Sequence, residues 1–128
     1  MKAIDTNVLL RFVAGDDPEQ EALAAACISE GVFVSHGVLM EAEWVLRRSY
    51  GWSRKSINAA LLSLLALQEV ETELPDQLQW ALDRHAAGAD WADMLHLVAA
   101  RRQSGFATFD RKLARAALKP PVPVELLG

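Results

Sequence analysis

Acidic residues recur in this sequence at places where a charged side chain is unexpected. Asp5 follows a short apolar run and precedes another, and Asp110 directly follows the segment FATF. Asp90 and Asp93 are three residues apart in GADWADMLHLVAA, so on a helix their Cβ atoms would be about 5–6 Å apart. Like charges placed this close destabilise a helix unless a cation or the helix dipole compensates. These acids are therefore candidates for a metal site.

A second segment, GVLMEAEWVLRRSYG, adds two glutamates. Glu41 and Glu43 would lie on opposite flanks of its apolar helical stripe, about equally far from the centre of the stripe. Helix geometry does not choose between them. Met40 and Trp44 would point to the outer face of this helix, where large apolar side chains are unexpected, and this indicates a partner surface.

Each acid also has a purely structural interpretation. Asp5, Asp90 and Asp110 stand where helices are expected to begin, and an aspartate there accepts hydrogen bonds from backbone N–H groups. Taken together, however, Asp5, Glu41, Asp93 and Asp110 would form a set of four carboxylates that needs a cation. Their hard oxygen ligands favour Mg²⁺ or Mn²⁺. Such a site suits hydrolysis of phosphodiesters by a metal-activated water.

The histidines and the cysteine form no metal-binding pattern. His36, His85 and His96 are scattered, without an HxxxH pair, which argues against zinc. His96 is one helical step from Asp93, and we expect it to have a packing or surface role. A single cysteine, Cys27, excludes an intrachain disulfide and a cysteine-based zinc cage, and its alanine-rich setting indicates a packed helix position.

Length and composition fit one globular domain. The 128 residues are 52% hydrophobic and 23% charged, which is neither a disordered nor a membrane composition. No apolar run approaches the ~20 residues of a membrane span. Asp5 stands where the apolar part of a signal peptide would begin, so we expect a cytoplasmic protein. The net charge of −4 argues mildly against a nucleic-acid binder, although basic residues cluster locally.

Short runs typical of strands alternate with longer helical patterns. We expect strands at 2–5, 32–35, 69–72, 106–109 and 122–125. We expect helices at 7–13, 18–30, 37–50, 53–67, 75–87, 90–104 and 110–117. The alternation predicts an α/β fold with a mainly parallel sheet. In such folds, sites form beyond the carboxyl ends of the strands, which is where Asp5 and Asp110 lie.

The segments AIDTNVLLRF, VLMEAEWVLRRSYGW, ADWADMLHLVAARRQSG and ATFDRKL resemble, in order and spacing, the PIN-domain nucleases. The resemblance is greatest to the VapC-like toxins of bacterial toxin–antitoxin pairs and covers nearly the whole chain. It implies one PIN-like domain over residues 1–128, folded as a three-layer α/β/α sandwich around a parallel sheet. It also implies a ribonuclease whose acids hold one or two Mg²⁺ or Mn²⁺ ions.

The resemblance assigns roles to individual residues. The four acids of the family correspond to Asp5, Glu41, Asp93 and Asp110. Glu41 is preferred to Glu43 because it stands three residues before the tryptophan of an E-x-x-W-V-L pattern. Asp90 matches an extra acid that would support the site or bind a second metal. Residues that would orient carboxylates or metal-bound waters are Thr6, Asn7 and Thr108.

The resemblance also implies partners. The substrate would be RNA, the protein would be a homodimer, and a small antitoxin would insert a segment into the acidic groove. An antitoxin arginine there would supply the positive charge of the metal. Met40 and Trp44 are candidates for the dimer or antitoxin surface. Arg48, Arg111 and Lys112 are candidates for contacts with the RNA backbone.

Three alternatives stay open at this point. A PIN-type nuclease that processes RNA without being a toxin would carry the same motifs. A phospho-acceptor signalling domain fits the length, but it needs an acid pair after the first strand and an aspartate where Glu73 stands. A non-catalytic binding module would use the acids only as helix caps.

Overall fold

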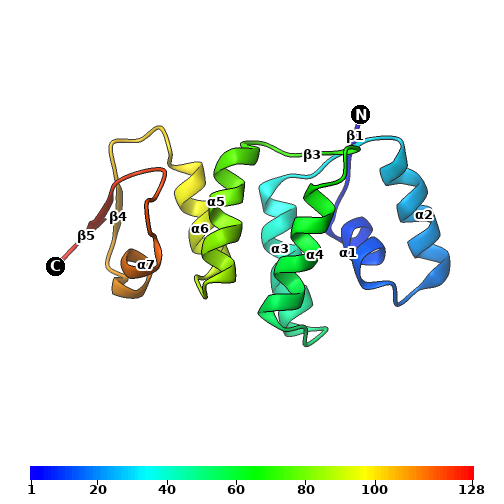
Figure 1. Ribbon diagram of the computed structural model, residues 1–128, viewed down its shortest axis with the longest axis horizontal. Coiled ribbons are helices and arrows are strands. Elements are labelled where there is room, and N and C mark those ends of the chain that lie inside the picture. The colour runs from blue at the N-terminus through cyan, green and yellow to red at the C-terminus, as the bar shows by residue number, and fades with distance from the viewer. The chain divides into compact units, whose positions relative to one another are not determined.

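The computed structural model describes residues 1–128, which divide into two compact units, Met1–Glu73 and Leu74–Gly128. We call them the N-terminal and C-terminal units. Helices and short strands alternate along both of them (Figure 1). None of the helices combines the length and the apolar composition needed to cross a membrane.

The N-terminal unit contains a parallel three-stranded sheet with the strand order β1-β2-β3. Its elements are β1 (Lys2–Ala3), α1 (Thr6–Ala14), α2 (Pro18–Ser29), β2 (Val32–Phe33), α3 (His36–Arg48), α4 (Arg54–Leu65) and β3 (Val70–Glu71). In the register, Lys2 is opposite Val32, and Val32 is opposite Val70. Asp5 and the start of α3 therefore follow neighbouring parallel strands.

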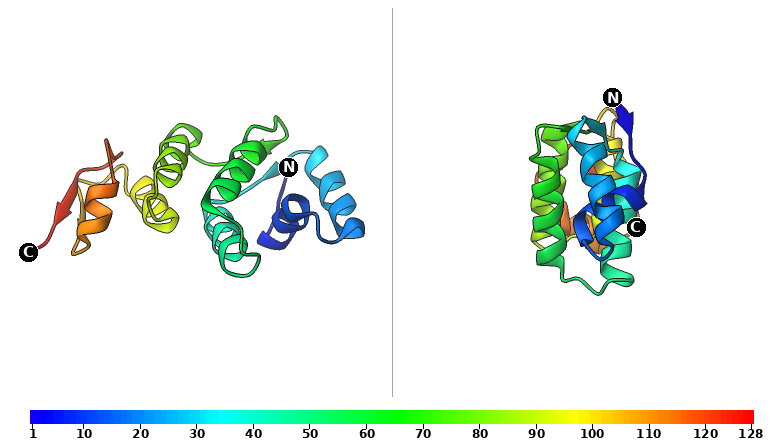
Figure 2. Two further views of the ribbon diagram at one scale, coloured as in Figure 1. Left: turned by 60° about the horizontal axis from the view of Figure 1, so that its bottom comes forward. Right: turned by 90° about the vertical axis from the view of Figure 1, so that its right-hand side faces the viewer.

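The helices of this unit begin where the sequence provides capping side chains. Asp17, Ser35 and Ser53 each accept a hydrogen bond from a backbone N–H of the first turn of α2, α3 and α4, respectively. The end of α1 is set by Gly15, which has a φ of 65° that glycine adopts without strain. α1 packs against α2 and α3 (Figure 2). Fully buried side chains of this unit include Leu9, Val32, Val34, Leu39, Leu46, Ile57 and Leu61.

The C-terminal unit combines three helices with a two-stranded parallel ladder. Its elements are α5 (Pro75–Ala86), α6 (Trp91–Ala99), β4 (Phe106–Thr108), α7 (Arg111–Ala116) and β5 (Val124–Leu126). In the ladder, Phe106 is opposite Val124 and Thr108 is opposite Leu126. α5 packs against α6, and their contact includes an edge-to-face pair of His85 and Trp91 whose ring centres are 5.5 Å apart.

The expected α/β fold with parallel strands is confirmed, because every observed strand pair is parallel and helices connect the strands. Several boundaries differ from prediction. Each strand pairs over only two or three residues instead of four. The helix expected over 90–104 ends at Ala99, and a turn follows in which Gln103 N–H donates to the carbonyl of Ala100. The last strand starts at Val124 rather than Val122, because Pro123 has no N–H to donate to a ladder.

Candidate functional site

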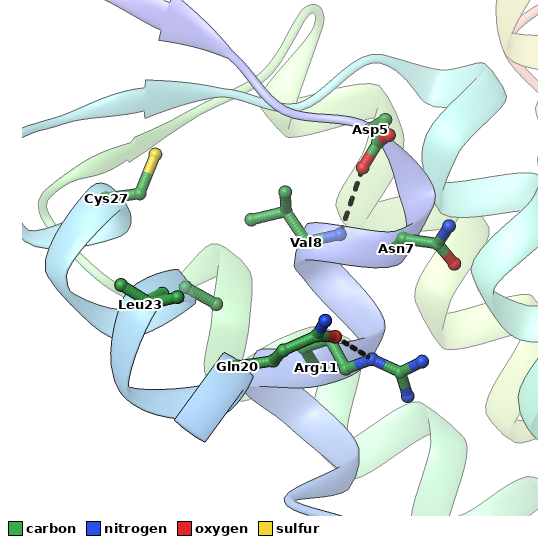
Figure 3. A pocket seen from close by; sticks show the side chains of 8 residues that line it. Asp5, Asn7, Val8, Arg11, Gln20, Leu23 and Cys27 are labelled. Atoms are coloured by element: carbon green, nitrogen blue, oxygen red, sulfur yellow. Dashed lines mark hydrogen bonds between the residues drawn. The ribbon is translucent and has the colours of Figure 1, made fainter. Parts of the chain in front are cut away.

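Asp5 combines a capping role with a free carboxylate oxygen. Its backbone is extended, and its Oδ1 accepts a hydrogen bond of 3.0 Å from the N–H of Val8 in the first turn of α1 (Figure 3). The side chain is exposed, and Oδ2 has no hydrogen-bond partner. One oxygen therefore holds the start of the helix while the other stays available to a ligand.

Glu41 lies on α3 and is tied to the start of α1. The hydroxyl of Thr6, the residue after Asp5, donates a hydrogen bond to Oε1 of Glu41. Thr6 is buried and Glu41 is exposed. The bond brings Glu41 to the carboxyl end of β1, and Oε2 of Glu41 remains without a partner.

The second glutamate of α3 has a different environment. Glu43 is only 5% exposed, and both of its carboxylate oxygens lie 3.1–3.2 Å from Nε of Arg47, one helical turn later. Both oxygens of Glu43 are thus committed to a pair within its own helix. Helix geometry alone did not separate the two glutamates, but their neighbours do.

The C-terminal unit holds the remaining acids at two helix starts. Asp90 caps α6, with Oδ1 accepting from the N–H of Asp93 at 3.0 Å. Asp110 caps α7, with Oδ1 accepting from Lys112 N–H at 2.8 Å and from Leu113 N–H at 3.1 Å. The sequence predicted a helix cap at Asp5, Asp90 and Asp110, and the structure confirms all three caps. The Oδ2 atoms of both caps have no hydrogen-bond partner.

Asp93 is the electrostatically strained member of this group. Burial raises the pKa of its carboxyl, and the negative charges of Asp90 and then Asp110 raise this pKa further, while nearby His96 opposes them. Asp93 is half-buried, and its carboxylate makes no hydrogen bond. Asp90 and Asp110 therefore lie near enough to Asp93 for their negative charges to disfavour its ionised form, and a nearby cation would oppose this effect.

Comparison with known proteins places this arrangement in a family. A family model described as "PIN domain" matches residues 2–119, nearly the whole chain. The chain belongs to the PIN-domain family. It is also similar to the VapC ribonuclease of Aquifex aeolicus (strain VF5), with 25% identity over 133 residues that cover 98% of each chain. The resemblance seen in four sequence segments is confirmed at the level of the PIN family.

The residues predicted to support the acids, Thr6, Asn7 and Thr108, lie close to them in the chain or in the fold. Thr108 ends β4, and its hydroxyl accepts a hydrogen bond of 3.0 Å from the N–H of Asp110, which orients that aspartate. Asn7 is exposed in the first turn of α1 and lines the same groove as Asp5 (Figure 3). The hydroxyl of Thr6 donates its hydrogen bond to Glu41.

The basic candidates for RNA contact are all at the surface of their units. Arg48 is exposed in the last turn of α3, and Arg111 and Lys112 are exposed in the first turn of α7. Of the two outer-face apolar residues, Trp44 is 52% exposed, whereas Met40 is half-buried. Trp44 is therefore the stronger candidate for a partner surface.

The donor set of this PIN domain fits a hard divalent cation. Within neither unit are three Asp, Glu, His or Cys side chains gathered closely enough to hold a metal ion. Each candidate acid nevertheless has at least one carboxylate oxygen without a hydrogen bond, and carboxylate oxygens are the ligands that Mg²⁺ and Mn²⁺ prefer. The candidate acids of the N-terminal unit are Asp5 and Glu41, and those of the C-terminal unit are Asp93 and Asp110, with Asp90 beside Asp93.

A groove beside Asp5 was not foreseen from the sequence. It has a volume of about 320 Å³ and runs between α1 and α2, with Asp5, Val8, Arg11 and Cys27 among its lining residues (Figure 3). Cys27 is half-buried there rather than fully packed. No local signal marks these positions, because they become neighbours only when α2 folds back onto α1.

Arg11 is fixed at one side of this groove. Its Nε donates to Oε1 of Gln20 at 2.7 Å, and its Nη1 lies 3.4 Å from Asp16 and from the hydroxyl of Tyr50. Tyr50 in turn donates to Asp16 at 3.1 Å. This network joins α1 to the start of α2 and to the end of α3, so it holds the helix that carries Asp5.

Proposed function

We propose that this PIN domain is a Mg²⁺- or Mn²⁺-dependent endoribonuclease and the toxin of a toxin–antitoxin pair. The observation that carries the proposal is the crowding of Asp93 by Asp90 and Asp110, with carboxylate oxygens left free. Repulsion between carboxylates that no hydrogen bond offsets lowers the stability of the folded protein. Acids held at such a cost are typical of functional sites. The name of the similar Aquifex protein, VapC ribonuclease, supports the same activity.

The four acids have defined tasks in this proposal. Asp5, Glu41, Asp93 and Asp110 bind the divalent cation, and Asp90 supports Asp93. A bound Mg²⁺ or Mn²⁺ supplies a nucleophilic water and stabilises the leaving oxygen of the RNA phosphodiester. Thr6 fixes the carboxylate of Glu41, and Thr108 fixes the backbone that carries Asp110. Arg48, Arg111 and Lys112 are proposed to contact the phosphates of the RNA.

RNA cleavage by the purified protein tests the activity. We expect a fluorescently labelled single-stranded RNA to be cut in Mn²⁺ and to stay intact in EDTA. Asp5→Asn should lower the rate at least about a hundredfold, because even residues that only support metal ligands cost 10–100-fold. Glu43→Gln, purified in the same way, is the matched control and should cut like wild type. Equal cleavage by Asp5→Asn and wild type would overturn the proposal.

The biological role is a separate part of the proposal. We propose that the protein acts in the cytoplasm as a homodimer and is inhibited by a small cognate antitoxin that binds the acids. Expression of the wild-type chain should arrest growth, and expression of Asp5→Asn should not. Co-expression of a small protein encoded beside this gene should restore growth. Continued growth with active enzyme present would instead favour a PIN nuclease with an RNA-processing role.

A further inference from the structure

A hollow in the C-terminal unit contains none of the acids described so far. It has a volume of about 430 Å³ and lies beside α5. Its lining residues are Asp76, Gln77, Trp80, Arg101, Lys119 and Pro121. Three stretches of the unit thus contribute: the first turns of α5, the turn after α6, and the segment after α7. An aromatic ring, two cations and two hydrogen-bonding side chains share one concave surface.

The aromatic ring of this hollow is held in place. Nε1 of Trp80 donates a hydrogen bond of 2.7 Å to the carbonyl of Leu118, the residue before Lys119. Trp80 is half-buried and lines the hollow, and this hydrogen bond anchors its ring to the segment after α7. A ring whose polar atom is already satisfied can stack on a flat ligand with little loss of side-chain entropy on binding.

The two cations of the hollow are unpaired. Neither Arg101 nor Lys119 forms an ion pair or a side-chain hydrogen bond, although Arg101 is half-buried. Lys119 has a φ of 50°, in the left-handed region, and it precedes Pro120. A residue that is not glycine rarely adopts this backbone, and a following proline favours extended backbone instead. The fold therefore holds Lys119 in a costly conformation beside the ring of Trp80.

We propose that this hollow binds a nucleotide of single-stranded RNA. The base stacks on Trp80, Arg101 and Lys119 bind the flanking phosphates, and Asp76 and Gln77 contact the edge of the base. Aromatic stacking combined with cationic contacts is how proteins hold unpaired nucleotides, and carboxylate and amide side chains read base edges. The inference rests on the proposed function, because it takes the ligand to be the substrate RNA.

The hollow is displaced from the acids along α6. Asp93 lies in the first turn of this nine-residue helix, and Arg101 follows two residues after its end. The helix is about 13 Å long at its usual rise per residue. The hollow would thus hold a nucleotide some way along the strand from the reacting phosphate, and it would contribute to affinity rather than to chemistry.

Binding of RNA in EDTA tests this inference apart from cleavage. The probe is a short fluorescein-labelled single-stranded RNA, and the readout is fluorescence anisotropy at several salt concentrations. The variant Arg101→Ala/Lys119→Ala should weaken binding about tenfold or more. It should also reduce the slope of log K against log salt by about 1.4, since each phosphate contact on a single strand contributes about 0.7. The matched control Arg102→Ala/Arg115→Ala removes two exposed arginines outside the hollow and should leave both quantities unchanged.

The role of the ring is tested by two substitutions. Trp80→Leu should weaken binding about tenfold without changing the salt slope, because stacking carries no counterion release. Trp80→Phe keeps an aromatic face and should retain most of the affinity. The same RNA in a duplex should lose the contribution of the hollow, because its bases are not free to stack.

The outcomes separate this inference from the proposed function. Equal binding and an equal salt slope for wild type and Arg101→Ala/Lys119→Ala would overturn the inference while leaving metal-dependent cleavage untouched. Weaker binding by this variant would support it even if the wild-type protein cut no RNA, in which case the proposed function alone would fail. If Arg101→Ala/Lys119→Ala weakened binding of the duplex as much as binding of the single strand, the assignment of the hollow to single-stranded RNA would be overturned.

Discussion

The hydroxyl of Thr6 donates a hydrogen bond to the carboxylate of Glu41, across 35 residues of the chain. Thr6 is the first residue of α1 and directly follows Asp5, whereas Glu41 lies in the middle of α3. The orientation of the candidate metal ligand Glu41 therefore depends on Thr6, the residue next to the candidate ligand Asp5. Because Thr6 is buried and Glu41 is exposed, the buried partner fixes the exposed one.

Thr6→Val tests this relationship, since valine keeps the shape of threonine and removes the hydroxyl. We expect RNA cleavage to fall about 10–100-fold, as is usual when a partner of a metal ligand is lost. The free energy of unfolding should fall by about 1–2 kcal/mol, because a hydrogen bond to a charged group is lost. Urea unfolding and initial cleavage rates measure the two effects. Thr6→Ser restores the hydroxyl and should recover most of the activity; failure of this rescue would argue that the methyl group, not the bond, matters.

Asp5 has two roles that different substitutions separate. Asparagine caps helices about as well as aspartate, so Asp5→Asn should change the free energy of unfolding by only a few tenths of a kcal/mol. Asp5→Ala loses the bond to the N–H of Val8 and should cost about 1 kcal/mol. Both variants should lose cleavage, because both lack the carboxylate. An active Asp5→Asn variant would show that Asp5 is a helix cap and nothing more.

The two glutamates of α3 should respond in opposite ways. Glu43→Ala breaks a partly buried pair with Arg47 and should lower the free energy of unfolding by about 1 kcal/mol while cleavage continues. Glu41→Gln keeps an acceptor for Thr6 but loses the charge, so it should abolish cleavage with little change in stability. Chemical denaturation and cleavage rates measured on both variants give the comparison. Loss of cleavage in the Glu43 variant at normal stability would reverse this assignment.

The raised pKa of Asp93 predicts how stability changes with pH. In the folded protein its carboxyl keeps a proton to a higher pH than the usual 3.8 of the unfolded chain, mainly because of burial and then because of Asp90 and Asp110. The folded state therefore binds more protons in this window, and the free energy of unfolding falls as pH rises through it. Asp93→Asn removes the ionisable carboxyl and therefore also this fall in the free energy of unfolding. In EDTA, its melting temperature should match that of wild type at the acid end of the window and exceed it at neutral pH.

A constant difference between Asp93→Asn and wild type at every pH would contradict this prediction. The control is Asp83→Asn, which changes an exposed aspartate on α5 that accepts a hydrogen bond from Gln79. Its difference from wild type should not grow with pH in the same window. A stabilised Asp93→Asn variant that no longer cuts RNA would show that this acid is kept for function at a cost in stability.

Local signals were sufficient for the elements and for the helix starts. Asp5, Asp90 and Asp110 were interpreted as possible caps because residue type and position determine a cap, and all three accept backbone hydrogen bonds. The end of α6 at Ala99 has no local signal, because the residues after it are good helix formers and no glycine occurs before Gly105. The strands are shorter than their apolar runs, because an apolar run does not reveal where its neighbour stops pairing.

Features that depend on packing between distant segments cannot be predicted from local sequence patterns. Glu41 and Glu43 are symmetric about the apolar stripe of α3, and only the positions of Thr6 and Arg47 distinguish them. The hollow at Trp80 joins three stretches that are far apart in the chain, so no motif indicated it. The family motifs single out the acids as candidates, but the free oxygens and the neighbours of Asp93 are seen only in the structure.

The central claim is that the acids bind a divalent cation, and the effect of Mn²⁺ on thermal unfolding tests it most directly. A ligand that binds only the folded state stabilises it, by about 2.7 kcal/mol at a concentration a hundredfold above its dissociation constant. We predict that Mn²⁺ raises the melting temperature of the wild-type protein and of Glu43→Gln, and that Asp93→Asn loses most of this rise. An equal rise in Asp93→Asn and wild type, or no rise in wild type, would contradict the account.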